Sequence, residues 1–212
     1  MAVIDLLSVI WTVTGLAVGW LPPGTDRQLA ARLAARAVEL DDSDPWGHLA
    51  LGYYAFACRE TDEAVRHFEA ALDLNPNFAA ATGSIGWALA LAGRSDEAIR
   101  NFEQALRMSP RDPFNSFFFS GIAVAHYLAM RLPEAVKSAR QAVQLRPGYM
   151  GAHRILCASL AQAGDIAEAK AVMENLQKLQ PDISIASLRQ SVPYTTGPME
   201  QFLDGLSKAG LR

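Results

Sequence analysis

The sequence predicts an all-α fold, a right-handed α-solenoid of helical hairpins with a C-terminal capping segment. Half of the 212 residues are hydrophobic and only 19% are charged, so the chain can bury one ordinary domain or one short solenoid. A repeat favours the solenoid, because four residues recur 34 positions downstream: Ala64, Phe68, Ala71 and Pro76 match Ala98, Phe102, Ala105 and Pro110. This period is typical of stacked hairpins, each too small to bury its apolar face alone.

The repeated residues each have a physical reason. Gly52 recurs as Gly86, and a residue without a side chain lets a neighbouring helix approach closely. In the second helix of each unit, two alanines flank a phenylalanine at spacings of three or four, so the three lie on one face. Pro76 and Pro110 lack an N–H group and fix φ, which ends one helix before the next hairpin.

These residues resemble the tetratricopeptide repeat (TPR) family, because the Gly, Ala, Phe, Ala and Pro positions of the two central units fall at the family's spacing. The chain departs from the family at the aromatic position of the first helix, which is His48 in one unit and Thr82 in the next, with Trp46 two residues before His48. The resemblance implies a superhelix of helix pairs whose inner face binds other proteins.

The repeat extends backwards into a degenerate hairpin at residues 1–44, since Ala30 and Ala37 precede Ala64 and Ala71 by the same interval. The apolar segment 3–21 would be its first helix. A secretory signal would have a basic leader and a small-residue cleavage site, and a bilayer-spanning helix needs about 20 apolar residues, so we expect neither. An uncovered apolar helix at the end of a stack predicts a partner, an upstream part of a longer protein, or a homodimer through this helix.

The intervals between helix-ending prolines define the downstream units. They are 34 from Pro76 to Pro110, 37 to Pro147 and 34 to Pro181. We place the three extra residues in a lengthened first helix around 114–119. The predicted units are repeats at 45–78, 79–112, 113–149 and 150–182, followed by capping helices at 183–212. Within the cap we expect a short helix at 183–190, a turn through Pro198 and a last helix from Met199 to about Lys208.

The C-terminal half carries a narrower resemblance. Residues 146–171, the aromatic insertion after 109–114, and the ending 202–212 look like the C-terminal TPR region of some bacterial class III adenylate or guanylate cyclases. In such proteins an upstream domain makes the cyclic nucleotide, and the repeats are taken to regulate it or recruit partners. No catalytic residue of a cyclase matches this chain, so the resemblance implies only a regulatory role.

Net charge limits the classes of partner that we expect, and the cysteine content bears on the compartment. A formal net charge of -3 gives no electrostatic footprint for nucleic acid and no polybasic signal for a membrane. RNA binding at one base per helical repeat shares the architecture, but the inner face lacks regularly repeated polar pairs. Cys58 and Cys157 lie in alanine-rich helices and suggest buried small side chains, not a disulfide framework. We expect a cytoplasmic protein with a protein or peptide partner, no nucleic acid and no membrane.

The sequence offers no catalytic, cofactor-binding or metal-binding constellation, which predicts a protein that is not an enzyme. The four histidines are scattered over three of the repeats, and no two have an i, i+4 metal-ligand spacing. There is no glycine-rich phosphate loop and no G-x-S-x-G motif. Ser84 lies between Gly83 and Gly86, but packing already explains these glycines.

Recognition is expected on the inner face, which the first helix of each hairpin lines in TPR proteins. The positions that supply Lys and Asn to clamp a C-terminal carboxylate in some of them are Leu49, Tyr53, Gly83 and Trp87 here, so we expect no chaperone-type acidic-tail ligand. Aromatic residues at this spacing are also typical of a core. The candidate groove residues are Trp46, Leu49, Tyr53, Phe56, Trp87, Leu91, Phe117, Val124, Tyr127 and Arg154.

Two functions follow from this sequence. The first is a protein-interaction scaffold that binds a hydrophobic peptide or helix in the groove, with Trp and Tyr as anchors. In a variant of this hypothesis, the chain's own tail or the apolar helix of another copy fills the groove. The second function is the regulatory end of a larger enzyme such as a nucleotide cyclase.

Overall fold

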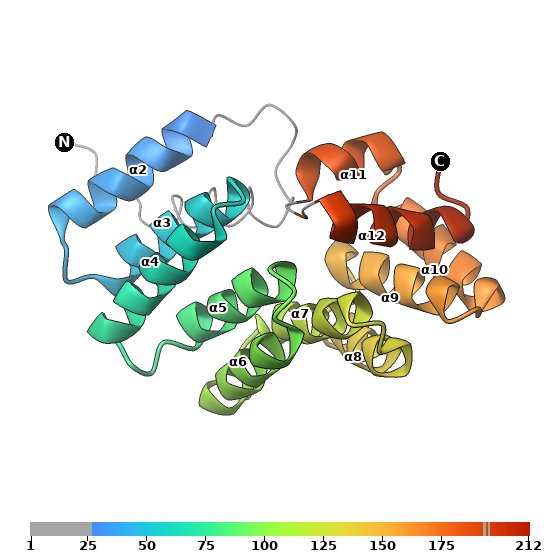
Figure 1. Cartoon of the computed structure of the whole chain (residues 1–212), viewed down its shortest axis with the longest axis horizontal. Coiled ribbons are helices and arrows are strands. Elements are labelled where there is room, and N and C mark those ends of the chain that lie inside the picture. Colours follow the sequence, from blue (N-terminus) through green and yellow to red (C-terminus); the bar gives the residue numbers. More distant parts are fainter. Residues whose placement is uncertain (1–26, 193, 195) are drawn as a thin grey trace.

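The structure is a computed structural model that describes residues 27–192, 194 and 196–212, and all secondary structure in these ranges is α-helical. The prediction of an all-α solenoid is confirmed (Figure 1). The helices are α2 (Arg27–Leu40), α3 (Pro45–Ala57), α4 (Thr61–Leu74), α5 (Ala79–Leu91), α6 (Ser95–Met108), α7 (Asn115–Leu128), α8 (Leu132–Leu145), α9 (Met150–Gln162), α10 (Ile166–Leu179), α11 (Ile185–Ser191) and α12 (Thr196–Lys208).

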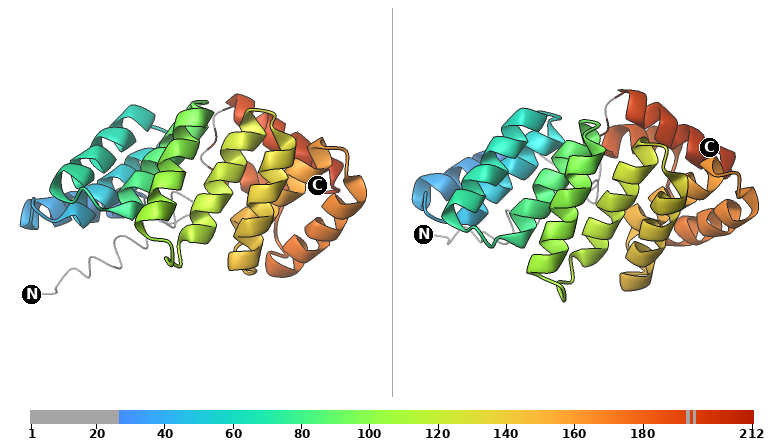
Figure 2. Two further views of the ribbon diagram at one scale, coloured as in Figure 1. Left: turned by 90° about the horizontal axis from the view of Figure 1, so that it is seen from below. Right: turned by 60° about the horizontal axis from the view of Figure 1, so that its bottom comes forward.

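Helices α3 to α10 form four antiparallel pairs that follow one another along an arc, with α5, α7 and α9 towards its inner side (Figures 1 and 2). The two helices of a pair differ in composition. Twelve of the 13 residues of α5 are buried, whereas α6 buries only Ala98, Phe102 and Ala105. A helix that is apolar all round packs between neighbours, while an amphipathic helix covers one side of them and faces solvent.

The repeated glycines and phenylalanines fit into one another, as the sequence predicted. Phe68 and Phe102 are fully buried. A Cβ atom added at Gly52 would lie 2.3 Å from Cε1 of Phe68. The ring of Phe102 meets two glycines, since a Cβ at Gly86 would lie 3.0 Å from it and one at Gly121 only 2.2 Å. Phe102 therefore holds together its own hairpin and the first helix of the next.

Each hairpin turn contains one residue in the left-handed backbone region. Gly93 and Gly164 take this place with φ of 80° and 90°, and Arg59 and Met130 take it with φ of 65° and 58°. Glycine adopts this conformation freely, whereas a side chain makes it costly. The turn geometry is thus kept in all four pairs even where the sequence does not supply glycine.

The extra residues of the third unit lie mainly in the loop before α7, which corrects the predicted lengthening of the helix. The loop 109–114 has six residues against four in 75–78, and α7 is only one residue longer than α5. Pro113 disfavours helix at Asp112. The Asp112 carboxylate instead accepts a 2.8 Å hydrogen bond from the backbone N–H of Phe114, which stabilises a loop at this place.

The tail folds back onto the last repeats. Its helix α12 packs on α9, and the Tyr127 hydroxyl on α7 donates a 2.7 Å hydrogen bond to the carbonyl of Gln201. Helix α11 begins after Ser184, which forms a capping box with Ser187. Helix α12 begins three residues earlier than predicted, because Pro198 lies in its first turn, where no N–H group is required.

The predicted first helix at 3–21 and the homodimer through it lie outside the described residues. Among the helices that are described, none is long and apolar enough to cross a membrane.

Candidate functional site

A stripe of large side chains follows the inner side of α3. Trp46, Leu49, Tyr53 and Phe56 are spaced by three or four residues and share one helix face. The Asp44 side chain caps this helix by accepting a hydrogen bond from the backbone N–H of Trp46. The Trp46 side chain is 39% exposed and packs edge-on against Phe78, with ring centroids 4.7 Å apart, whereas the rest of the stripe is buried.

Trp46, Leu49 and Tyr53 of this stripe line a hollow of about 480 Å³, which we call the Trp46 hollow. Trp46 and Phe114 are its exposed large apolar residues, and Phe114 is 41% exposed. Inside it, burial raises the pKa of Tyr53 to about 12, and the Tyr53 hydroxyl is hydrogen-bonded to Ser84 at 2.8 Å. The hollow is lined by Trp46, Leu49, Tyr53, Asn77, Phe78, Ala79, Ala80, Met108, Ser109, Asp112, Pro113, Phe114 and Phe118.

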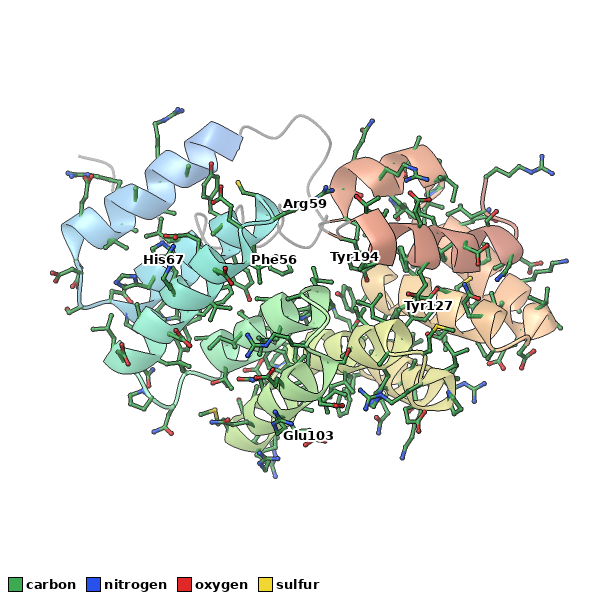
Figure 3. All side chains as sticks on the ribbon, in the orientation of Figure 1. Phe56, Arg59, His67, Glu103, Tyr127 and Tyr194 are labelled. Atoms are coloured by element: carbon green, nitrogen blue, oxygen red, sulfur yellow. The ribbon has the colours of Figure 1, made fainter. Side chains whose placement is uncertain are left out.

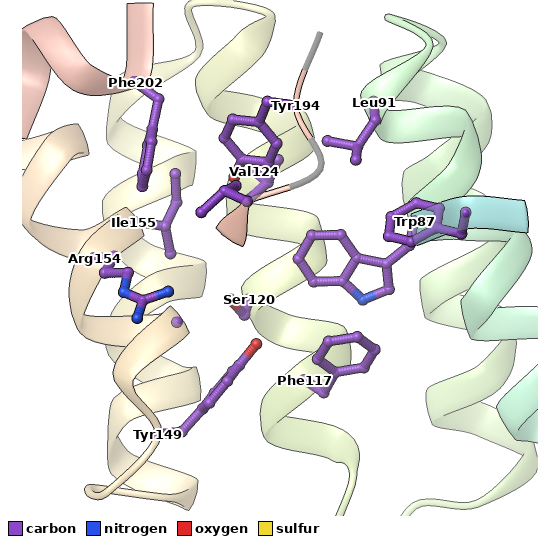
Figure 4. Close-up of a pocket in the computed structure, with 13 residues that line it drawn as sticks. Trp87, Leu91, Phe117, Ser120, Val124, Tyr149, Arg154, Ile155, Tyr194 and Phe202 are labelled. Atoms are coloured by element: carbon purple, nitrogen blue, oxygen red, sulfur yellow. The ribbon is translucent and has the colours of Figure 1, made fainter. Parts of the chain in front are cut away.

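Phe56 leads into a second space of about 50 Å³ between α5, α7 and α9, which we call the Arg154 cavity. In Figure 4, Trp87 and Phe117 stand on one side of it, Arg154 on the other, and Ser120 and Tyr149 between them. Trp87 and Phe117 stack with centroids 4.8 Å apart. The cavity is lined by Phe56, Trp87, Leu91, Phe117, Ser120, Val124, Tyr149, Gly151, Arg154, Ile155, Val192, Tyr194 and Phe202.

The tail supplies part of this lining. Tyr194 is buried and packs edge-on against Phe202 of α12 at 5.1 Å. Phe56 from the first complete pair and Tyr194 from the tail border the same cavity although they are far apart in sequence (Figure 3). Val192, Tyr194 and Phe202 thus line the cavity, and the hypothesis that the tail fills the groove stays a prediction.

Two polar side chains of the cavity, Arg154 and Trp87, can only donate hydrogen bonds, whereas the hydroxyls of Ser120, Tyr149 and Tyr194 both donate and accept. The guanidinium of Arg154, whose side chain is 5% exposed, donates through Nη2 to Oε1 of Gln180 at 2.5 Å. Its Nε, and Nε1 of Trp87 across the cavity, have no hydrogen-bond partner among the described residues. The hydroxyls of Tyr149 and Ser120 are hydrogen-bonded to each other, and burial raises the pKa of Tyr149 to about 12.

The ten groove residues fall into three places. Trp46, Leu49 and Tyr53 line the Trp46 hollow, and Phe56, Trp87, Leu91, Phe117, Val124 and Arg154 line the Arg154 cavity. Tyr127 is fully buried beneath α12. The sequence-based groove did not include Tyr149, Phe114 or Phe78, each of which directly precedes a first helix. The repeat itself was a signal for Phe78 and Tyr149, because both immediately precede a first helix.

The described residues contain no group of three or more His, Cys, Asp or Glu side chains that could hold a metal ion. The fold brings His48 and His67 together, with ring centroids 5.8 Å apart, although their spacing of 19 gives no sign of it. His67 also lies 3.2 Å from Glu63. Ser84 is buried and bonded to Tyr53 and to the carbonyl of Ala80, which is a packing role.

The family model described as tetratricopeptide repeat matches residues 49–113 and 92–149, together just under half of the chain. No curated protein matches the sequence at a significant level.

Solved structures show the same architecture. PilW, described as a widely conserved type IV pilus biogenesis factor, has a TM-score of 0.68 at 19% identity and covers 95% of this chain and 89% of its own. The structure of pilF of Pseudomonas aeruginosa has a TM-score of 0.64 at 16% identity and covers 96% of this chain and 88% of its own. YrrB, described as a TPR protein with an unusual peptide-binding site, has a TM-score of 0.53 at 21% identity and covers 83% of this chain and 90% of its own. Residues 49–149 are thus similar to tetratricopeptide repeats, and the chain shares its fold with solved structures that include a TPR protein.

Proposed function

We propose that this chain is a non-enzymatic interaction module that binds a hydrophobic peptide or helix of a protein partner along its inner face. The Trp46 hollow carries the proposal. A space of about 480 Å³ that combines apolar walls with two exposed aromatic residues, Trp46 and Phe114, has the features of a recognition site. Aromatic anchors seated in pockets supply most of the energy in such interfaces.

The shape of the inner face agrees with a ligand longer than one side chain. Helices α3, α5 and α7 each contribute to both the Trp46 hollow and the Arg154 cavity. The α3 stripe runs from one to the other. A segment that places one side chain in each would lie across the first helices. Peptide binding also has a precedent in this fold, since YrrB is described as a TPR protein with an unusual peptide-binding site.

The proposal can be tested by selecting peptides from a displayed random library and measuring their affinity by fluorescence anisotropy. Trp46→Ser should weaken binding by on the order of 2 kcal/mol, about thirtyfold, because it removes an anchor. Leu145→Ser is the matched control, since Leu145 is a 58% exposed apolar residue on the outer helix α8. The proposal is wrong if no peptide is selected, or if Trp46→Ser and Phe114→Ser bind as tightly as the parent.

Regulation of a linked nucleotide cyclase is the second hypothesis, and it rests on the sequence resemblance alone. The cytoplasmic location, the homodimer and the exclusion of nucleic acid and membrane likewise stay predictions.

A further inference from the structure

Arg154 is the only Asp, Glu, Lys or Arg in the four first helices α3, α5, α7 and α9. The second helices, by contrast, carry several charges each and form ion pairs such as Arg94 with Glu97 and Arg140 with Glu168. Burial of a single arginine in an otherwise uncharged inner layer is costly unless a partner compensates it. The partner of this guanidinium is therefore of functional interest.

The described residues do not supply a full partner. Arg154 makes no ion pair with any of them, and its one hydrogen bond goes to the neutral side chain of Gln180. Burial lowers the pKa of Arg154, and Tyr149, Tyr194 and the exposed Asp182 oppose this only in part. The charge is thus desolvated without a carboxylate in contact.

A second buried donor belongs to a residue that lines the same cavity. Nε1 of Trp87 is buried without a partner among the described residues, and Trp87 lies across the cavity from Arg154 (Figure 4). The Tyr149 and Ser120 hydroxyls are bonded to each other, the lining also includes the hydroxyl of Tyr194, and the remaining side chains are apolar. Two unpartnered N–H groups in an apolar cavity require an acceptor, and a carboxylate accepts from an arginine and an indole at once.

We propose that the Arg154 cavity receives the side-chain carboxylate of an Asp or Glu in the bound peptide, with Arg154 and Trp87 as its donors and apolar residues on either side of the acid. This inference rests on the proposed function and names the ligand class of the same face. The cavity of about 50 Å³ holds a few water molecules by volume, which suits the end of one side chain and not a folded element.

The position of the cavity favours a side chain over a chain end. The Trp46 hollow continues the face on the α3 side, and Tyr194 and Phe202 continue its apolar lining on the tail side. A peptide crossing this face passes the cavity with main chain in both directions. Leu49, Tyr53, Gly83 and Trp87 supply no Lys or Asn for a clamp on a terminal carboxylate, and Arg154, which occupies in the fourth repeat the place of Leu49 and Gly83, is the one basic residue at these places.

The test uses acid-containing peptides selected against the whole chain. Each is synthesised as the acid, as its Asn or Gln amide, and with a free or amidated C-terminus. We expect the side-chain amide to bind on the order of tenfold more weakly than the acid and C-terminal amidation to change little. Arg154→Met should bind acid and amide alike, Arg154→Lys should keep part of the preference, and Trp87→Phe should reduce it by removing the indole N–H.

Arg107→Met is the matched control, because it removes one positive charge from an exposed position on α6. Circular dichroism establishes that each variant is folded. If folded Arg154→Met still prefers the acid as strongly as the parent, the inference is wrong while the proposed function stands. A loss caused by C-terminal amidation alone would also overturn it, in favour of a chain end. If no peptide binds, the proposed function itself fails.

Discussion

Alanine at Gly52 and at Gly86 should have unequal effects although the two glycines are equivalent in the repeat. A carbon contact is comfortable at about 3.5 Å, so the buried ring of Phe68 must retreat by about 1.2 Å for Gly52→Ala. For Gly86→Ala the ring of Phe102 must move by about 0.5 Å, and the carbonyl oxygen of Ala98, at 3.1 Å, must give by a few tenths of an ångström. Overpacking of this kind costs about 1–3 kcal/mol, and replacing a helical glycine by alanine returns about 1 kcal/mol.

We therefore expect Gly52→Ala to lower the free energy of unfolding by about 1–2 kcal/mol and Gly86→Ala to change it by less than about 0.5 kcal/mol. Urea unfolding followed by circular dichroism measures both. Because repeat arrays can unfold in stages, the transition should also be followed by tryptophan fluorescence.

A double variant tests the cause. Leucine lacks the Cε1 and Cζ atoms that approach Gly52, so adding Phe68→Leu to Gly52→Ala should cost less than the two single changes combined. Strict additivity, or equal effects of Gly52→Ala and Gly86→Ala, would refute the steric explanation.

Two further predictions concern the tail and pH. Tyr127→Phe removes the hydrogen bond from Tyr127 to the Gln201 carbonyl and should destabilise the docking of α12 by about 1 kcal/mol. The variant should therefore show faster amide exchange than the parent in α12 but not in α4. Equal protection of α12 in parent and variant would contradict this prediction. Burial, with help from Arg131, lowers the pKa of His126 against the opposing carboxylates Glu134, Asp96 and Glu103. Because the folded chain holds the proton of His126 less tightly than the unfolded chain does, protonation favours unfolding. The stability that neutral His126 allows is complete above the unfolded pKa of about 6.5 and is lost as the pH falls below it. Between pH 7.5 and 5.5 the urea midpoint should therefore fall less in His126→Gln than in the parent.

The repeat made the architecture predictable because its signals are local. Gly52 predicts a close approach of two helices, Phe68 predicts a side chain that fills the space between them, and Pro76 predicts the end of a helix. The structure has all three features. The insertion of the third unit was misplaced because sequence gives only the interval between Pro110 and Pro147. Whether three residues enter a helix or a loop depends on the contacts of Asp112 with Ser109 and Phe114, which the interval does not contain.

The candidate site was predictable only on the side that the repeat builds. Helical spacing placed Trp46, Phe56 and Trp87 on the inner face, but exposure depends on what covers that face. Tyr194 and Phe202 come from the segment that breaks the period, so no repeat position predicts that they border the same cavity as Phe56. Tyr127 was predicted to line the groove by the same spacing, and the tail buries it instead.

The tail also affects the solvation of Arg154. Tyr194 borders the same cavity, so the docked tail contributes to the burial that desolvates the guanidinium. Tail docking is therefore opposed by an unpaired charge and favoured by the apolar burial of Tyr194 and Phe202. A bound carboxylate pairs with the Arg154 charge and so removes the energy that opposes docking of the tail. A ligand that binds better when the tail is docked must also stabilise the docked state. Peptide binding and docking of the tail are then linked, and Tyr127→Phe, which loosens α12 far from any ligand contact, should weaken acidic peptides more than their amides.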